Sequence, residues 1–257
     1  MYALVTGASS GIGKEIAILL AKKGYNLILV ARRKKRLEDL QEYIDRKYSV
    51  QVLIKECDLS IRDNCFSLFE ECKKYHIQVL INNAGFGKVG QFQKIPCEDE
   101  IAMIQTNIMA LLILTKLYVN HMRKGYILNV ASIAGFQPVP MMATYGATKA
   151  FVLNFSQSVN YELKRHHKKV SISTLCPGPV NTEFNQVAGA EFNLQSITAK
   201  KCALEAIQGL FSKKDVIIPS ISIKVLHGLS KIAPNKIILP VEYKIQVAKR
   251  DNPNSPD

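Results

Sequence analysis

An apolar segment at the start of the chain runs directly into a glycine-spaced turn, and this junction restricts the fold more than any other feature. Residues 2–6 read YALVT, and Gly7-Ala8-Ser9-Ser10-Gly11-Ile12-Gly13 follows at once. A buried strand, a tight turn and a helix that begins within the turn are typical of a nucleotide-binding βα unit, whose helix N-terminus faces a phosphate. Gly7 permits the turn, Gly11 lets the backbone approach a pyrophosphate, and Gly13 allows close contact between helix and strand. A plain tight turn is the structural alternative.

Apolar β-rich segments alternate along the chain with longer segments of helical periodicity. Strands are expected at residues 2–6, 26–30, 50–54, 78–81, 126–130, 170–175 and 216–218, and helices at 11–23, 33–47, 63–75, 99–122, 144–165 and 198–211. Strands that are apolar throughout are buried on both faces, and their alternation with helices implies right-handed βαβ crossovers. The sequence therefore predicts an α/β fold, a Rossmann-type doubly wound parallel sheet in a three-layer αβα arrangement. One domain is expected over residues 1–250, followed by a disordered tail at 251–257.

Net charge and cysteine usage narrow the class of protein. The chain has 34 basic and 21 acidic residues, a net charge of +13, which suits a nucleic acid, a membrane surface or a phosphorylated small molecule as partner. Nucleic-acid binding is not expected, because no aromatic platform is interleaved with the basic residues. The six cysteines form no C-x-x-C pair and have no histidines at zinc spacing, so we expect reduced thiols and no metal site.

The start of the chain and its apolar runs favour a cytoplasmic location. Only Met1 precedes the first apolar segment, which leaves no room for a cleavable signal peptide. The best candidate for a membrane span is residues 108–114, and Thr115 and Lys116 interrupt it well before it could cross a bilayer. We therefore expect a soluble intracellular protein.

A tyrosine and a lysine stand four residues apart in the expected helix 144–165. One helical turn places Tyr145 and Lys149 on the same face, so both side chains can reach a common point. Such a pair also occurs by chance on solvated helix faces, so its meaning depends on the rest of the chain.

The chain resembles the short-chain dehydrogenase/reductase family in six ordered elements. TGASSGIG at residues 6–13 is similar to the family's cofactor turn, Asn82-Asn83-Ala84-Gly85 to its NNAG element, and Pro177-Gly178 to its PG turn. Asn107, Ser132 and the Tyr145–Lys149 pair fall where the family carries its catalytic residues. The resemblance covers residues 1 to about 220. It implies a single-domain Rossmann oxidoreductase.

The resemblance also implies a role for individual residues. Tyr145 would be the acid/base, Ser132 would donate a hydrogen bond to the substrate oxygen, and Lys149 would bind the nicotinamide ribose. Asn107 would hold a water that links Lys149 to solvent, and Asp58 would contact the adenine. The implied cofactor-binding set is Gly7, Ser9, Ser10, Gly11, Ile12, Gly13, Arg32, Arg33, Asp58, Leu59, Asn83, Ala84, Gly85, Tyr145, Lys149, Pro177, Gly178, Val180 and Thr182.

The residues after the second expected strand bear on the choice of dinucleotide. An enzyme that prefers NAD usually places an acid here for the ribose 2′-hydroxyl, whereas this chain has Arg32 and Arg33. A guanidinium suits a 2′-phosphate in charge and in geometry. NADP(H) is therefore expected in preference to NAD(H), mainly through Arg32 and secondarily through Arg33. Residues 34–36 are assigned to a solvated basic face.

A tyrosine acid would need a suitable pKa. Free tyrosine has a pKa of about 10, and a nearby cation favours the phenolate, so Lys149 is expected to lower the pKa of Tyr145. The predicted function is an NADP(H)-dependent oxidoreductase that interconverts a carbonyl and a secondary alcohol. The alternative is a catalytically silent NADPH-binding regulatory protein. Apolar residues around the catalytic segment favour a hydrophobic ketone or a 3-oxoacyl substrate, namely Phe136, Val139, Met141, Met142, Phe184 and Phe192.

The C-terminal part of the chain is expected to serve the substrate end. Residues from about 190 to 240 are assigned to a substrate lid and C-terminal elements, which in a homodimer or homotetramer could also form a subunit contact. The segment 221–240 mixes lysines with leucine and isoleucine, and contact with a membrane surface is a secondary alternative for it.

Overall fold

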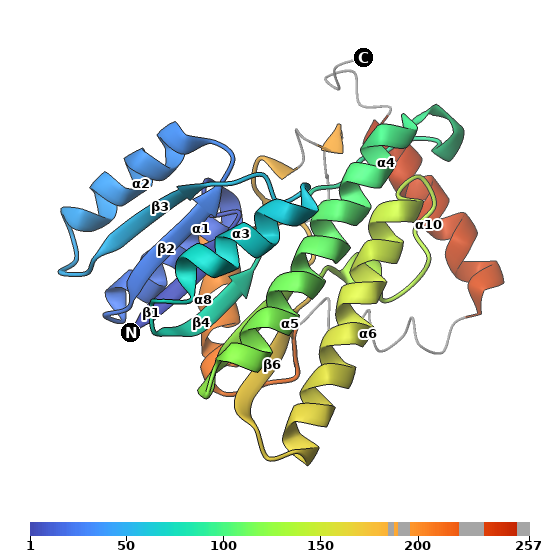
Figure 1. Cartoon of the computed structure of the whole chain (residues 1–257). Coiled ribbons are helices and arrows are strands. Elements are labelled where there is room, and N and C mark those ends of the chain that lie inside the picture. Colours follow the sequence, from blue (N-terminus) through green and yellow to red (C-terminus); the bar gives the residue numbers. More distant parts are fainter. Residues whose placement is uncertain (185–187, 190–195, 221–233, 251–257) are drawn as a thin grey trace.

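The computed structural model describes residues 1–184, 188–189, 196–220 and 234–250. These residues form a seven-stranded sheet in the order β3-β2-β1-β4-β5-β6-β9, with every neighbouring pair parallel (Figure 1). The strands are β1 (Tyr2–Thr6), β2 (Asn26–Ala31), β3 (Val52–Glu56), β4 (Ile77–Asn82), β5 (Lys124–Val130), β6 (Lys169–Leu175) and β9 (Val216–Ile217). The expected doubly wound parallel sheet is confirmed, and all seven expected strands are present.

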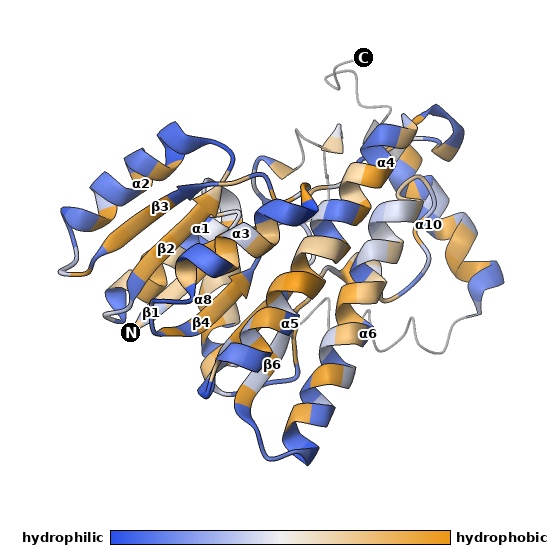
Figure 2. Cartoon of the chain, in the orientation of Figure 1, coloured by the Kyte–Doolittle hydropathy of each residue, from blue (hydrophilic) through white to orange (hydrophobic). Residues whose placement is uncertain are grey.

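Helices cover both faces of the sheet. One face carries α1 (Gly11–Lys22), α2 (Lys34–Asp45) and α8 (Ala199–Phe211), whose buried residues share a core with β1 and β2. The other face carries α3 (Arg62–Cys72), α5 (Leu111–His121) and α6 (Ala143–Arg165), which lie in front of the sheet in Figure 1. Figure 2 shows β2 and β4 as mainly hydrophobic, and nearly all of their residues are buried, because helices cover both faces of the sheet.

The expected helix 99–122 is longer and less regular than a plain α-helix. It starts as α4 (Cys97–Ile104), continues as a π-helical segment, η2 (Gln105–Ala110), and ends as α5. Segments of π-helix inside α-helices are frequent at functional sites, and this one contains Asn107. The residue pattern alone does not indicate that part of this helix is π-helical.

This helix also changes one expectation about membranes. By length and composition the 25-residue stretch Cys97–His121 could cross a membrane, whereas residues 108–114 alone were too short. Of its most apolar window, 44% is buried, and Leu114 and Tyr118 lie in the core against the sheet. One side of the stretch therefore packs on the sheet, whereas Ile101, Ile104 and Met109 of the same stretch are exposed.

A buried polar network joins the sheet to α6, which carries the Tyr-Lys pair. Asn82 Nδ2 on β4 donates to Asn129 Oδ1 on β5 at 2.9 Å and to Thr115 Oγ1 on α5 at 3.0 Å. Asn129 Nδ2 donates to Ser156 Oγ on α6 at 2.9 Å. Directional bonds among buried groups are costly to break, so this network fixes the position of α6 on the sheet.

Several short elements and the 16-residue helix α10 complete the side of the molecule where the strands end. These are η1 (Phe92–Lys94), η3 (Ile133–Gly135), the paired strands β7 (Val180–Asn181) and β8 (Ile197–Thr198), and α10 (Asn235–Arg250). The expected lid at about 190–240 falls partly on residues 190–195 and 221–233, which lie outside the described residues, as do Phe192 and the expected tail 251–257. Much of the segment considered for membrane contact lies outside them as well.

Candidate active site

A cleft of about 630 Å³ opens where the carboxyl ends of the parallel strands meet. It lies beside the point where the strand order reverses, between β1 and β4, which is the usual ligand position in a doubly wound sheet. Every residue of the implied cofactor-binding set lines this cleft except Gly13. Ser132 lines it too, and Asn107 does not. The fold thus gathers most of the predicted residues in one place, and their individual roles remain predictions.

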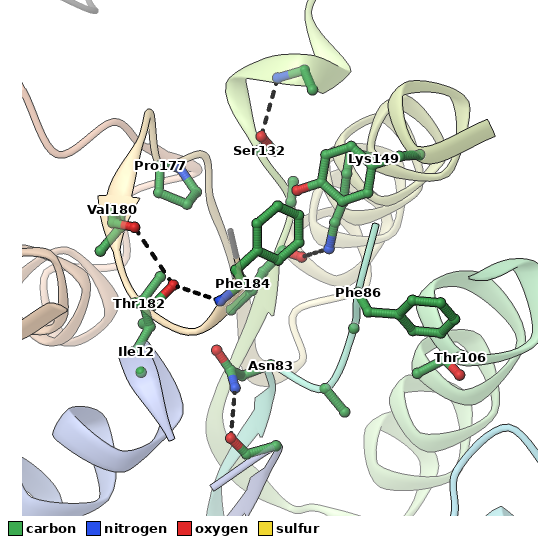
Figure 3. Close-up of a pocket in the computed structure, with 18 of the residues that line it drawn as sticks. Ile12, Asn83, Phe86, Thr106, Ser132, Lys149, Pro177, Val180, Thr182 and Phe184 are labelled. Atoms are coloured by element: carbon green, nitrogen blue, oxygen red, sulfur yellow. Dashed lines mark hydrogen bonds between the residues drawn. The ribbon is translucent and has the colours of Figure 1, made fainter. Parts of the chain in front are cut away.

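The glycine turn is held against the segment that follows β4. Thr6 Oγ1 accepts hydrogen bonds from the backbone N–H groups of Asn83 and Ala84 at 2.9 and 3.0 Å. Asn83 Nδ2 donates to the carbonyl oxygens of Thr6 and Gly7, each at 3.1 Å, as Figure 3 shows for this side chain. Gly13 lies behind the turn, where a Cβ would lie 2.4 Å from both Asn83 Nδ2 and the Gly7 carbonyl oxygen.

The start of α1 fits an anionic ligand. Ser10 is the N-cap residue, and its side chain makes no capping hydrogen bond to the first turn. Backbone N–H groups at a helix N-terminus attract phosphate when no side chain occupies them. The residues present therefore fit the pyrophosphate of a dinucleotide.

The two arginines after β2 have different surroundings. Arg32 is exposed, and its Nη1 lies 4.0 Å from Asp58 Oδ2. Arg33 turns back to the glycine turn, where its Nη2 donates to Ser9 Oγ at 3.1 Å and to Ser10 Oγ at 2.9 Å. Its Nη1 pairs with Glu183 Oε2 at 2.8 Å. Arg33 is therefore more closely tied to the phosphate end of the cleft than Arg32.

The opposite end of the cleft holds Ser132, Tyr145 and Lys149. Ser132 forms a hydrogen bond with the Tyr145 hydroxyl and accepts one from Ala134 N–H at 3.2 Å. Lys149 Nζ donates to the Val130 carbonyl oxygen at 2.9 Å and lies 5.7 Å from the centre of the Tyr145 ring (Figure 3). The expected juxtaposition of Tyr145 with Lys149 is therefore present.

Burial governs the pKa values of this pair. It raises the pKa of Tyr145 to about 12, and the hydrogen bond from Ser132 opposes that shift only in part. The expected net lowering of the Tyr145 pKa is therefore wrong for the protein without cofactor, because burial dominates its pKa. Burial also lowers the pKa of Lys149 to about 8, because a charged ammonium is poorly solvated there.

Asn107 serves the site indirectly. Its Oδ1 accepts from Phe86 N–H at 3.1 Å, and its Nδ2 donates to the Phe86 carbonyl oxygen at 2.9 Å and to Thr148 Oγ1 at 3.1 Å. The amide thus ties the η2 segment to the irregular segment that follows β4 and to α6. The expected role of Asn107 in holding a water that links Lys149 to solvent stays a prediction.

Comparison with known proteins decides the family. A family model described as short chain dehydrogenase matches residues 1–227.

The chain belongs to the short-chain dehydrogenase family.

Relatives in this family include reductases and steroid dehydrogenases. A very-long-chain 3-oxoacyl-CoA reductase from Vanderwaltozyma polyspora is 38% identical over 190 residues, which cover 66% of this chain and 53% of that protein. The chain thus spans about half the length of that relative. An 11-beta-hydroxysteroid dehydrogenase-like 4A from Arabidopsis thaliana is 30% identical over 246 residues, covering 91% of this chain and 81% of the relative.

A solved short-chain dehydrogenase has the same overall structure. The enzyme from Sphingobium yanoikuyae in complex with NADPH superposes with a TM-score of 0.80 at 31% identity, covering 91% of this chain and 96% of the other. A 7beta-hydroxysteroid dehydrogenase structure superposes with a TM-score of 0.84 at 23% identity, which shows the fold alone.

The cleft of this short-chain dehydrogenase also contains residues that the sequence did not indicate. Phe86, Thr106, Gln137, Glu242 and Gln246 line it. Gln137 Nε2 donates to Glu242 Oε1 at 2.5 Å, so α10 is joined to the loop after β5 at the rim. No motif marks these positions, although the apolar and basic pattern near the C-terminus indicated a lid. Of the described residues expected at the substrate end, Val139, Met142 and Phe184 line the cleft, and Phe136 and Met141 do not.

Within the described part of the chain, no group of three or more His, Cys, Asp or Glu side chains could hold a metal ion.

Lys149 should be a source of instability in the free protein. Its pKa of about 8, against an ordinary 10.5, means that the buried charged ammonium lowers the free energy of unfolding by about 3 kcal/mol. The unfolded state binds more protons between about pH 8 and 10.5, so stability rises with pH across that window, and the full cost of the buried charge applies below about pH 8.

We expect Lys149→Met to raise the free energy of unfolding by about 2 kcal/mol at pH 7. Removing the buried charge contributes about 3 kcal/mol, and loss of the hydrogen bond to Val130 costs about 1 kcal/mol. The gain should shrink as the pH rises towards 10. Urea denaturation of both proteins at pH 7 and pH 9.5 measures this. Equal stability of the two proteins at pH 7, or a gain that does not change with pH, would contradict the expectation.

Proposed function

We propose that this chain is an NADPH-dependent reductase that interconverts a carbonyl and a secondary alcohol, acting on a hydrophobic ketone or a 3-oxoacyl substrate. One observation carries the proposal. A single cleft has a glycine turn with basic residues at one end and the Ser132–Tyr145–Lys149 group at the other. The names of the reductase and dehydrogenase relatives support the same reaction class.

Tyr145 is suited to act as an acid. With its pKa raised to about 12, its phenol keeps its proton at neutral pH and can deliver it to a carbonyl oxygen that is being reduced. When bound, NADPH supplies the hydride. Ser132, which already bonds the Tyr145 hydroxyl, is placed to donate a hydrogen bond to the same substrate oxygen. The protonated phenol is the form that carbonyl reduction requires.

Lys149 contributes both a positive charge near Tyr145 and a fixed position in the cleft. Its ammonium lies within 5.7 Å of the Tyr145 ring and is buried, so its charge acts through a poorly screened medium. It favours negative charge that develops on the phenol as the proton leaves. Its bond to Val130 holds it in the cleft, at the position where the resemblance places the nicotinamide ribose.

The preference for NADPH over NADH rests on charge. Arg33 lies against Ser9 and Ser10 of the glycine turn, and Arg32 lies nearby at the rim. A 2′-phosphate would gain charge-assisted hydrogen bonds from these guanidinium groups. The solved neighbour from Sphingobium yanoikuyae contains NADPH, which supports the same choice.

The substrate end is lined by apolar side chains. Phe86, Val139, Met142, Phe184 and Ile245 surround the space in front of Tyr145. Such a lining favours a substrate with bulky or extended apolar groups on its carbonyl. The relatives named as acting on very-long-chain 3-oxoacyl-CoA and on steroids fit this class.

A homodimer or homotetramer is proposed as the assembled form. The helix formed by α4, η2 and α5 exposes Ile101, Ile104 and Met109 by 41–48%. Large apolar residues that share an exposed helix are favourable sites for contact with a second copy. Sedimentation velocity of the purified protein measures the assembly directly.

The reaction is tested by following nicotinamide absorbance with NADPH, a panel of ketones of increasing size and 3-oxoacyl thioesters. We expect turnover with at least one bulky apolar member and a lower kcat/KM with NADH. A protein that binds NADPH yet reduces none of these substrates would instead behave as a silent NADPH-binding regulator. Failure to bind either dinucleotide would overturn the proposal.

A further inference from the structure

Glu183 forms an ion-pair bridge across the phosphate end of the cleft. Its Oε2 lies 2.8 Å from Arg33 Nη1, and its Oε1 accepts a hydrogen bond from Arg36. The two arginines hold the pKa of the Glu183 carboxyl below its ordinary value. Both terminal nitrogens of Arg33 are therefore engaged, Nη1 by Glu183 and Nη2 by Ser9 and Ser10.

The bridge joins the two walls of the cleft. Ser9 and Ser10 belong to the turn between β1 and α1, whereas Glu183 follows β7, 150 residues beyond Arg33. Thr182 fixes the local backbone, because its Oγ1 accepts from Phe184 N–H at 3.3 Å, and it lies close to Ile12 at the start of α1 (Figure 3). A Cβ on Gly11 would lie 3.1 Å from Thr182 Cγ2, so this loop rests on the glycine turn itself.

We propose that Glu183 limits the affinity for NADPH, because its carboxylate already pairs with Arg33, the guanidinium that the 2′-phosphate of NADPH would bind. This inference deepens the proposed function and rests on it. A phosphate that binds Arg33 must displace the Glu183 carboxylate or lie beside it. In the second case the negative charges of the phosphate and the carboxylate repel each other. NADH has no 2′-phosphate and can bind with the bridge intact.

The expected effect of removing the carboxylate is therefore unequal for the two dinucleotides. Glu183→Gln keeps the shape of the side chain and removes its charge. Exposed ion pairs are weak, so we expect the Kd for NADPH to fall about three- to tenfold. The Kd for NADH should change less than about twofold. Isothermal titration calorimetry of the full chain with each dinucleotide measures both values.

Two probes separate the 2′-phosphate from the rest of the cofactor. Adenosine 2′,5′-bisphosphate should gain affinity in Glu183→Gln by the same factor as NADPH, and adenosine 5′-monophosphate should not. Neither probe carries nicotinamide, so the result does not depend on turnover. Asp39→Asn is the matched control, because it removes one carboxylate, paired with Lys35, from the neighbouring helix α2 and leaves the bridge alone. Asp39→Asn should not change the affinity for one of the two probes more than for the other.

The outcomes are distinct. A selective gain for the 2′-phosphorylated ligands in Glu183→Gln alone supports the proposal. If Glu183→Gln weakened the binding of NADPH and of NADH equally, Glu183 would hold the loop closed over any dinucleotide. If Asp39→Asn changed NADPH affinity as much as Glu183→Gln does, the effect would be one of general charge. Either result overturns the proposal. If the wild-type protein reduces ketones with NADPH and Glu183→Gln changes nothing, only this inference fails. If the wild type binds no dinucleotide, the proposed function fails with it.

Discussion

Tyr145→Phe is expected to lower kcat for carbonyl reduction by about 10²- to 10⁴-fold while NADPH affinity changes by less than about twofold. The substitution removes the hydroxyl that bonds Ser132 and leaves the ring packed against Phe184, with 5.4 Å between ring centres. Loss of a positioned proton donor slows the chemical step and leaves dinucleotide binding at the other contacts unaffected. Stopped-flow turnover and fluorescence titration of NADPH measure the two quantities separately.

Tyr118→Phe is the matched control for this substitution. Tyr118 is a fully buried tyrosine of α5 whose hydroxyl has no hydrogen-bond partner in the structure, so removing that oxygen should leave both activity and NADPH affinity unchanged. Burial of an unpartnered hydroxyl is unfavourable, and a small rise in stability is expected. If Tyr145→Phe turned over normally, the assignment of Tyr145 as the acid would be wrong.

Gly13→Ala should abolish measurable dinucleotide binding and lower stability by about 1–3 kcal/mol. A Cβ at this position would lie 2.4 Å from the Gly7 carbonyl oxygen and 2.4 Å from Asn83 Nδ2, far inside any normal contact. Backbone atoms cannot move aside as a flexible side chain does, so the turn between β1 and α1 must shift. Thermal unfolding and calorimetric titration with NADPH test the two effects.

Gly24→Ala separates this steric effect from the general cost of replacing a glycine. Gly24 has φ +82°, and a Cβ added there would have no described atom within 4 Å, so its replacement costs about 1 kcal/mol through backbone strain alone. NADPH binding should be retained in that variant. Retained NADPH affinity in Gly13→Ala would show that the turn tolerates the shift and would count against its proposed role.

Much of the fold could be predicted from local patterns. Residues 27–30 and 127–130 are buried as expected, because helices cover both faces of the central strands of a parallel sheet. The glycine turn was predictable as well. Gly7 and Gly11 both have positive φ, a conformation that residues other than glycine rarely adopt. Element ends differed by a few residues, as with β3, which starts at Val52 rather than residue 50.

The candidate site was only partly predictable. Spacing alone placed Tyr145 and Lys149 on one helical face, and they do meet in the cleft. The direction of the tyrosine pKa was wrong because the sequence shows the neighbouring charge and does not show how deeply the phenol is buried. The hydrogen bonds of the Asn107 amide to Phe86 and Thr148, and its place in a π-helical segment, were not predictable from the sequence.

By itself, the sequence determined the order of strands and helices along the chain, the glycine turn and the spacing of Tyr145 and Lys149 on one helical face, since all of these depend on near neighbours in the chain. Only the tertiary structure decided what those residues meet. It set Glu183 against Arg33, placed Glu242 and Gln246 of α10 at the substrate end, and buried Tyr145 and Lys149 together. Contacts between distant segments and the dielectric around a side chain arise from packing, and no local pattern of residues encodes them.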